Sequence, residues 1–160
     1  MPNTKVLIAY QTKGGVAGEY AAIVADVLRA SGLEVDIVDL KEQGRPDIAP
    51  YGAVVIGSGI RLGRWYGRAK RMLNRDYGER PVAIFLASGG AGKPETYDES
   101  REKYLTRVLA KRPHLKVVAA EAFGGRYIMA GTVVDDNRQP DKVRAWAGEL
   151  AGKLKGNQYQ

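Results

Sequence analysis

The sequence predicts an α/β three-layer sandwich, in which a parallel sheet carries helices on both faces. Short apolar runs typical of strands alternate with segments whose apolar residues recur at helical spacing. Such alternation favours parallel strands joined by crossover helices. The first run, Val6–Tyr10, is followed by a Gly-containing turn and a helical pattern over Val16–Ala30. That order places backbone N–H groups at a helix N-terminus, which suits a phosphate group.

Five strands and four helices are expected. The first, third and fourth apolar runs are almost wholly apolar, as strands covered on both faces should be, whereas the second alternates and indicates an edge strand. The expected strands are Val6–Tyr10, Leu33–Leu40, Ala53–Gly57, Pro81–Ala87 and Leu115–Phe123. The expected helices are Val16–Ala30, Arg64–Arg75, Asp98–Ala110 and Pro140–Lys155. Five strands of this kind favour the sheet order 2-1-3-4-5.

Length and composition indicate one domain over residues 1–160, with a polar tail at 155–160 that we expect to fray. The chain has no cysteine and a single histidine, which excludes disulfides, thiolate chemistry and a multi-histidine metal site. No apolar run approaches the ~18 residues of a membrane span. Pro2 and Asn3 leave no room for a signal peptide before the first strand, so a cytoplasmic location is expected. The net charge of +7 predicts attraction to anions.

Three loops rich in glycine and hydroxyl residues are expected to meet at one end of the sheet. They are Gln11–Ala17, Ser58–Trp65 and Ser88–Tyr97. In a sheet of this order the ligand lies beyond the carboxyl ends of the strands, where these loops fall. Turn formation alone would explain the glycines of any one loop. Three such loops at the ligand end are a stronger indication of a binding site, because glycine lets the backbone approach a ligand closely.

Three segments carry a family resemblance. They are Lys5-Val-Leu-Ile-Ala-Tyr-Gln-Thr-Lys-Gly-Gly15 with Glu19-Tyr-Ala21, Val54-Val-Ile-Gly-Ser-Gly-Ile-Arg-Leu-Gly-Arg-Trp65, and Phe123-Gly-Gly-Arg-Tyr127. These segments resemble the flavodoxin superfamily, and within it the flavodoxin-domain branch that includes the menaquinone-dependent protoporphyrinogen oxidases. The resemblance covers about residues 4–127 and implies a flavodoxin-like fold.

The resemblance implies non-covalently bound FMN. The first loop would hold the ribityl phosphate, and the second and third loops would flank the isoalloxazine ring. The residues implied to bind the cofactor are Gln11, Thr12, Lys13, Gly14, Gly15, Val16, Ala17, Ser58, Gly59, Ile60, Arg61, Gly63, Trp65, Ser88, Gly89 and Gly90. Neither a catalytic acid–base set nor a set of metal ligands is expected.

Two departures from the family pattern bear on function. Val16 and Ala17 stand where the family has hydroxyl residues, and each lost hydrogen bond to a charged group costs about 1.5–3 kcal/mol. The affinity for FMN is therefore left open. Only residues 125–139 stand where the protoporphyrinogen oxidases carry a long basic, aromatic insertion, which counts against porphyrin dehydrogenation.

Several side chains near the expected ring site have two interpretations. Trp65 is expected to stack on the flavin, with burial in the core as the alternative. Tyr66, Tyr97 and Tyr127 are rival stacking residues. Arg61 is expected to face the polar edge of the flavin or an anionic partner, with a solvated loop position as the alternative.

Three functions are compatible with these features. The first is an FMN-binding, flavodoxin-like redox protein that transfers electrons. The second is a flavin dehydrogenase similar to the protoporphyrinogen oxidases, and the third is a flavodoxin-fold binding module that has lost flavin. Both an FMN-dependent oxidoreductase and a protein without enzymatic activity of its own are compatible with these features.

The expected partner is an acidic redox protein or an anionic small molecule. Residues 61–75 hold six basic residues and no acidic one. A nucleic-acid partner would rest on charge alone and is not expected. The oligomeric state is open, with a homodimer as one alternative.

Overall fold

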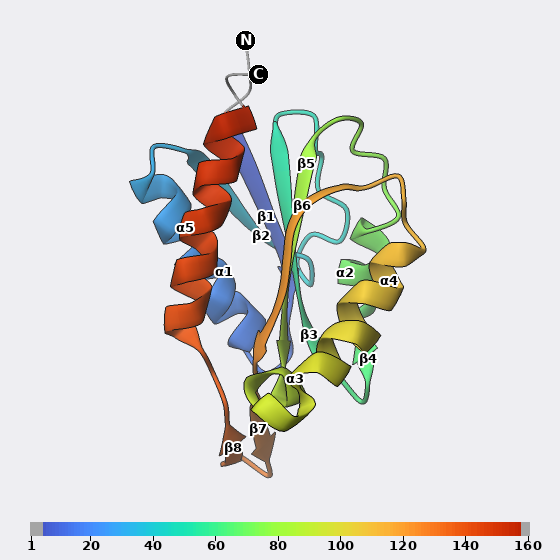
Figure 1. The fold of residues 1–160 in the computed structure, drawn as a ribbon, viewed down its shortest axis with the longest axis vertical. Helices are drawn as coiled ribbons and strands as arrows, with labels where there is room; N and C mark the ends of the chain where they lie inside the picture. The colour runs from blue at the N-terminus through green and yellow to red at the C-terminus, as the bar shows by residue number, and fades with distance from the viewer. Residues whose placement is uncertain (1–4, 158–160) are drawn as a thin grey trace.

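A computed structural model describes residues 5–157 and shows an α/β fold around one six-stranded sheet (Figure 1). Its five long strands are parallel and run in the order β2-β1-β3-β5-β6, which confirms the predicted order of the five expected strands. The short β4 pairs antiparallel with the end of β3. The strands of this sheet are β1 (Lys5–Gln11), β2 (Glu34–Asp39), β3 (Ala53–Arg61), β4 (Arg64–Trp65), β5 (Pro81–Ser88) and β6 (Lys116–Gly124).

Helices cover both faces of the sheet, so the expected three layers are present. Helices α1 (Val16–Ala30) and α5 (Pro140–Asn157) lie on one face. The other face carries α2 (Gly67–Met72), α3 (Pro94–Arg101) and α4 (Arg107–Ala110). The π-helical turn η2 (Glu102–Thr106) joins α3 to α4, and the 3₁₀ turn η1 (Gly89–Gly92) follows β5.

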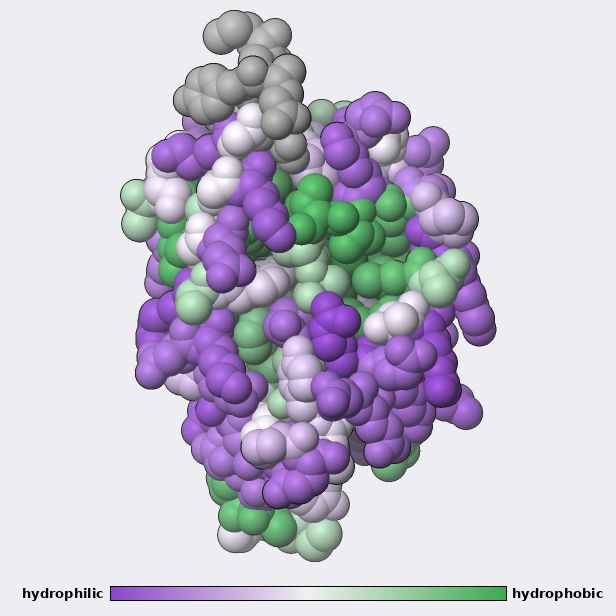
Figure 2. All heavy atoms as spheres, viewed as in Figure 1, coloured by the Kyte–Doolittle hydropathy of each residue, from purple (hydrophilic) through white to green (hydrophobic). Residues whose placement is uncertain are grey.

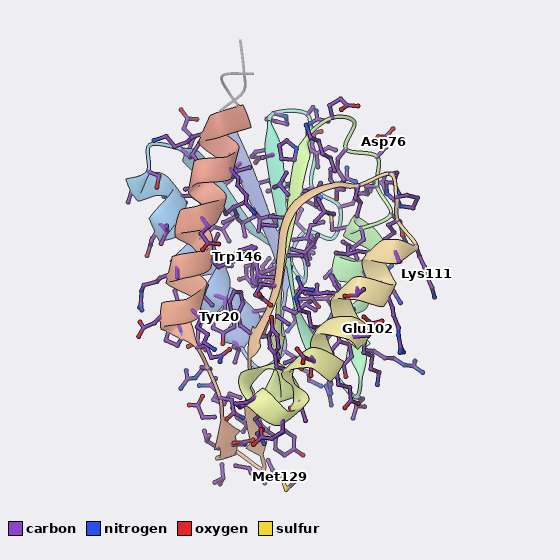
Figure 3. All side chains as sticks on the ribbon, viewed as in Figure 1. Tyr20, Asp76, Glu102, Lys111, Met129 and Trp146 are labelled. Carbon is purple, nitrogen blue, oxygen red and sulfur yellow. The ribbon has the colours of Figure 1, made fainter. Side chains whose placement is uncertain are left out.

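Successive side chains of a strand point to opposite faces of the sheet, so the strands contribute to two separate hydrophobic cores, one on each face. Beneath α1 and α5, Phe123 makes edge-to-face contacts with Tyr20 and Trp146, and Trp146 makes another with Phe85. Figure 3 shows Tyr20 and Trp146 between these helices and the sheet. Beneath α2, α3 and α4 the core includes Ile56, Trp65 and Leu105 among other buried residues.

A β-hairpin that follows β6 was not predicted. After β6 the chain forms β7 (Arg126–Met129) and β8 (Thr132–Asp136), an antiparallel pair outside the main sheet. Its turn residues Ala130 and Gly131 both have positive φ, as a tight two-residue hairpin requires. Figure 1 shows this hairpin projecting beyond the carboxyl end of the sheet, next to α3.

Four helix boundaries differ from the prediction, and one of them is the end of α2, which lies at Met72 and not at Arg75. Helix α2 begins at Gly67 and not at Arg64, because the chain turns back at Leu62 and Gly63 and Arg64–Trp65 pair with β3. Helix α3 begins earlier, at Pro94, a residue suited to a first helical position. Helix α5 extends to Asn157, so the expected frayed tail is helical over 155–157, and its remaining residues lie outside the described part of the chain.

Candidate functional site

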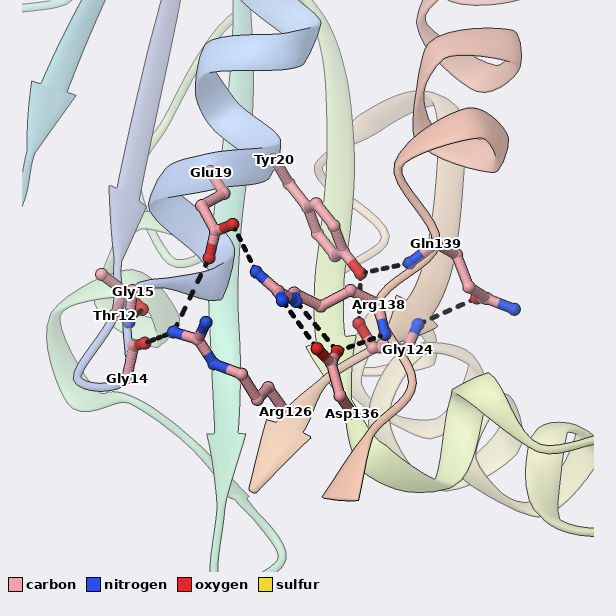
Figure 4. Close-up of polar contacts among 10 residues, drawn as sticks. All are labelled: Thr12, Gly14, Gly15, Glu19, Tyr20, Gly124, Arg126, Asp136, Arg138 and Gln139. Carbon is pink, nitrogen blue, oxygen red and sulfur yellow. Dashed lines mark hydrogen bonds and ion pairs between the residues drawn. The ribbon is translucent and has the colours of Figure 1, made fainter. Parts of the chain in front are cut away.

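The first glycine loop forms the entrance to α1 (Figure 4). The Thr12 hydroxyl oxygen accepts a hydrogen bond from the Gly15 N–H at 2.9 Å. Gly15 has φ +89°, a conformation that favours glycine, and α1 begins at the next residue. The first N–H groups of a helix have no partner within the helix, and the positive end of the helix dipole lies there. The loop therefore presents donors of the kind that bind phosphate.

Arg126 reaches this loop from the start of β7. Its Nη2 donates to the Gly14 carbonyl oxygen at 3.0 Å and lies 3.9 Å from a Glu19 carboxylate oxygen. Its Nε–H is buried and, within residues 5–157, has no hydrogen-bond partner. A buried N–H group without a partner is costly, and an anionic oxygen at the loop would satisfy it.

A second arginine fixes the base of the hairpin to α1. Arg138 binds Glu19 at 2.9 Å and Asp136 at 2.6 Å. Its hydrogen bonds hold the pKa of Asp136 at about 2, below the usual value of 3.8. Beside this pair, the Tyr20 hydroxyl donates to the Gly124 carbonyl oxygen and accepts from the backbone N–H of Gln139. These contacts join α1, β6, β8 and the segment before α5 around the loop (Figure 4).

The three glycine loops do come together, around a small cavity of about 80 Å³. The cavity is lined by Thr12, Gly14, Val16, Ala17, Gly59, Ile60, Tyr66, Ala87, Gly89, Gly125 and Arg126. It is well below the roughly 300–1,000 Å³ of pockets that enclose a whole ligand. Its size suits a phosphoryl group, so a ring system attached to that group would lie outside the cavity, on the rim.

Seven of the sixteen predicted residues line this cavity: Thr12, Gly14, Val16, Ala17, Gly59, Ile60 and Gly89. Val16 and Ala17 contribute through their backbone, because their side chains are buried in the core beneath α1. Neither side chain carries a hydroxyl, so the donors that these two positions can offer a ligand are their backbone N–H groups.

The other predicted residues lie around the cavity without lining it. Gln11 caps a helix, since its Oε1 accepts from the N–H groups of Arg68 and Ala69 in the first turn of α2. Ser58 is buried and donates to the Gly59 carbonyl oxygen, and Ser88 is also buried. Lys13, Arg61 and Gly63 are exposed at the same end of the sheet. Gly15 and Gly90 act through the backbone, as the N-cap of α1 and as the acceptor of a Thr96 hydrogen bond.

Trp65 takes the alternative position, in the core. It is 8% exposed, and its indole N–H donates to the Tyr104 carbonyl oxygen at 2.8 Å. Its neighbour Tyr66 faces the cavity instead: a Cβ built on Gly59 would lie 2.8 Å from the Tyr66 ring. Burial is the main reason that the pKa of Tyr66 is raised.

A basic groove lies beside the loop, between α2 and the segment after β2. A cavity of about 470 Å³ is lined by Lys41, Glu42, Gly44, Arg45, Arg68, Arg71, Met72 and Arg75. Arg68 is held in place by hydrogen bonds from its Nη1 to the carbonyl oxygens of Leu40 and Lys41, at 2.8 and 2.7 Å. Five basic side chains thus face one acidic side chain around this groove.

Within residues 5–157, no three histidine, cysteine, aspartate or glutamate residues are close enough to hold a metal ion. Over the same residues, no helix has the length and apolarity needed to cross a membrane.

The fold and its glycine-lined loop define an α/β protein of the flavodoxin-like class. A family model described as a flavodoxin domain matches residues 7–132, most of the chain, and the chain therefore belongs to the flavodoxin domain family. The family and the fold are those that the sequence predicts.

Among curated proteins, the chain is similar to the protoporphyrinogen IX dehydrogenase [quinone] of Escherichia coli, with 26% identity over 108 residues. The match covers 66% of this chain and 60% of the relative, so the chain spans less than two thirds of that protein.

Many solved structures share the fold, and two of them illustrate the likeness. One is the rubredoxin oxygen:oxidoreductase of Desulfovibrio gigas, with a TM-score of 0.70 and 18% identity over 97% of this chain and 37% of that one. The other is oxidised flavodoxin 2 of Bacillus cereus, with a TM-score of 0.64 and 19% identity over 96% of this chain and 99% of that one.

Proposed function

We propose that this protein binds FMN non-covalently, with the phosphate on the loop at the start of α1, and transfers electrons through it. The observation that carries the proposal is the buried, unpartnered Nε–H of Arg126 at a glycine-lined cavity of phosphate size. An arginine and a helix N-terminus together offer charge and several N–H donors to a dianion.

The residues of the chain have separate tasks in this proposal. Thr12, the first turn of α1 and Arg126 hold the phosphate. Tyr66 stands at the cavity beside Gly59 and supplies an aromatic face for the ring. When bound, FMN supplies the redox chemistry, and the protein supplies position and electrostatics.

The partner that we propose is acidic. The basic groove beside α2 lies next to the loop, since Gln11 of the loop caps the helix that carries Arg68. Its attraction for an acidic redox protein would be screened beyond about 10 Å at 0.1 M salt. Electron transfer to an acidic acceptor should therefore slow as ionic strength rises, and a rate independent of salt would exclude this part of the proposal.

A purified preparation tests the cofactor proposal. We expect the protein to bind added FMN with quenching of flavin fluorescence, and to release a yellow flavin on denaturation. A protein that stays colourless after FMN is added would support the third alternative, a fold that has lost flavin. The cytoplasmic location remains a prediction.

Substrate dehydrogenation is a second candidate, favoured by the likeness to the protoporphyrinogen dehydrogenase. The chain offers the short β7–β8 hairpin of residues 126–136 where the oxidases carry a long insertion. An assay of porphyrinogen oxidation with a quinone acceptor separates the two functions. Turnover in that assay would favour substrate dehydrogenation over the electron-carrier function.

A further inference from the structure

The β7–β8 hairpin exposes an apolar tip. Residues 127–134 read Tyr-Ile-Met-Ala-Gly-Thr-Val-Val and include no charged side chain. Five of them are large apolar side chains exposed by 42–59%. Figure 3 labels Met129 at the far end of the hairpin, and Figure 2 shows apolar residues gathered at that end of the molecule. Exposed apolar clusters of this kind mark interaction surfaces.

The tip is apolar on both faces of the ribbon. Ile128 pairs with Val133, and Met129 pairs with Thr132. Because side chains alternate along a strand, Tyr127 and Met129 lie on one face while Ile128 lies on the other. A protein surface placed against one face would leave the other in water. An apolar medium that surrounds the tip covers both faces.

At a lipid surface, apolar side chains are buried to a depth of about 5–10 Å. No complementary protein surface is needed there, because acyl chains and headgroups surround the tip on all sides.

The base of the hairpin is held firmly. Arg126 and Arg138 bind Glu19 of α1, and Lys93 binds Asp135 of β8 at 3.0 Å. The backbone N–H of Asn137 donates to the Gly125 carbonyl oxygen at 2.8 Å. These contacts keep the tip pointing away from the sheet and pair the acidic residues at its base with cations.

A second apolar projection lies at the same end of the sheet. Leu62 is 90% exposed at the β3–β4 turn, where its positive φ holds it outward. Arg61 and Arg64 flank it, and Lys13 lies on the neighbouring loop. Within residues 5–157 these three cations form no ion pair with an acidic side chain, so they are available to anionic headgroups.

We propose that this end of the molecule binds the surface of an anionic lipid bilayer. The β7–β8 tip and Leu62 enter the interfacial layer, and Lys13, Arg61 and Arg64 contact lipid phosphates. The glycine loops then face the membrane. This binding does not depend on the proposed cofactor, so it is tested with the protein as purified, with or without FMN.

Sedimentation with vesicles measures the binding. Phosphatidylcholine vesicles, with and without phosphatidylglycerol, separate the apolar contribution from the charged one. Replacing Ile128, Met129 and Val133 together by Ser should lower the partition coefficient on anionic vesicles at least tenfold. The matched control is Ile37→Ser with Val117→Ser, which removes side chains exposed by 38% and 37% elsewhere on the sheet and should leave binding unchanged. Changing Arg61 and Arg64 to Gln should lower binding only where phosphatidylglycerol is present.

A single tryptophan at the tip gives a second readout. Trp65 and Trp146 also emit, so the emission of the added tryptophan is read as the difference from wild type on the same vesicles. On anionic vesicles, this difference emission of Met129→Trp should shift to shorter wavelength and be quenched by brominated lipids, whereas that of Val117→Trp should not change. Absence of co-sedimentation, or co-sedimentation with no change at position 129, would overturn the proposal. A wild-type dimer in light scattering that becomes monomeric in the Ser variant would also overturn it, in favour of a second copy of the chain.

Discussion

The guanidinium of Arg126 donates a hydrogen bond to the carbonyl oxygen of Gly14 at 3.0 Å, across 112 positions of the sequence. This contact ties the segment after the last long strand to the first loop of the chain. It places a cation beside the helix N-terminus, where the inward-packed Val16 and Ala17 supply no hydroxyl. In the proposed function, Arg126 donates the hydrogen bonds to the phosphate that hydroxyl groups at those two positions would otherwise donate.

Arg126→Gln tests this role. The change removes the positive charge and leaves fewer N–H donors. A hydrogen bond to a charged group contributes about 1.5–3 kcal/mol. We expect FMN affinity to fall roughly 10- to 150-fold. Riboflavin affinity should stay unchanged, because riboflavin lacks the phosphate. Fluorescence titration of both ligands measures the two constants.

Arg126→Lys serves as the control, since it keeps the charge and should retain part of the FMN affinity. An equal loss for FMN and riboflavin in the Gln variant would mean that Arg126 acts on the fold and not on the phosphate.

Gln11→Ala tests the cap of α2. Its side-chain oxygen accepts from two N–H groups of the first turn, and loss of a helix cap costs about 0.5–2 kcal/mol. The free energy of unfolding in urea should fall by this amount. Gln11→Glu keeps an acceptor at a helix N-terminus and should be close to wild type. Equal destabilisation by Ala and Glu would argue against a capping role.

Tyr66→Ala tests the aromatic face at the cavity. An aromatic contact contributes about 0.5–1.5 kcal/mol beyond its area, so FMN and riboflavin affinities should both fall about 2- to 13-fold. Tyr66→Phe keeps the ring and should preserve both. If Tyr66→Ala bound both ligands as tightly as wild type, the ring would have to lie elsewhere on the rim.

The Asp136–Arg138 pair predicts a pH dependence in acid. The folded pKa of Asp136, about 2, lies below its ordinary value of 3.8. The stabilising effect is therefore present above about pH 4 and is lost as pH falls from 3.8 towards 2. The difference in unfolding free energy between wild type and Asp136→Asn should shrink over this range in urea titrations. If the difference in unfolding free energy stayed constant with pH, the Asp136–Arg138 pair would not be its source.

The parts of the fold that follow local rules were predictable from the sequence. Helix α1 begins at Val16 and ends at Ala30 as predicted, because Gly15 and Gly32 take positive φ at its two ends. The strand order was also predictable, because five strands that alternate with helices favour the order 2-1-3-4-5, which the five long strands have.

The hairpin was not predictable, because its turn carries Ala130 and Gly131 and lacks the Asn-Gly or Asp-Gly pair that marks such turns. The pairing also skips Val134, which interrupts the alternation of β8.

The placement of side chains at the site depends on contacts that the sequence does not show. Trp65 and Tyr66 are neighbours, yet pairing of Arg64–Trp65 with β3 turns Trp65 into the core and leaves Tyr66 at the cavity. Arg126 was missed because its partner, Gly14, is far away in the sequence. The available signal was the position of Arg126 directly after Gly124 and Gly125, at the end of the last long strand.

The binding of FMN compared with riboflavin by the wild-type protein tests the central claim most directly. If the loop at the start of α1 and Arg126 hold a phosphate, FMN should bind at least a hundredfold more tightly than riboflavin, and the difference should narrow as salt is raised. Equal affinities for the two flavins, or binding of neither, would contradict the account.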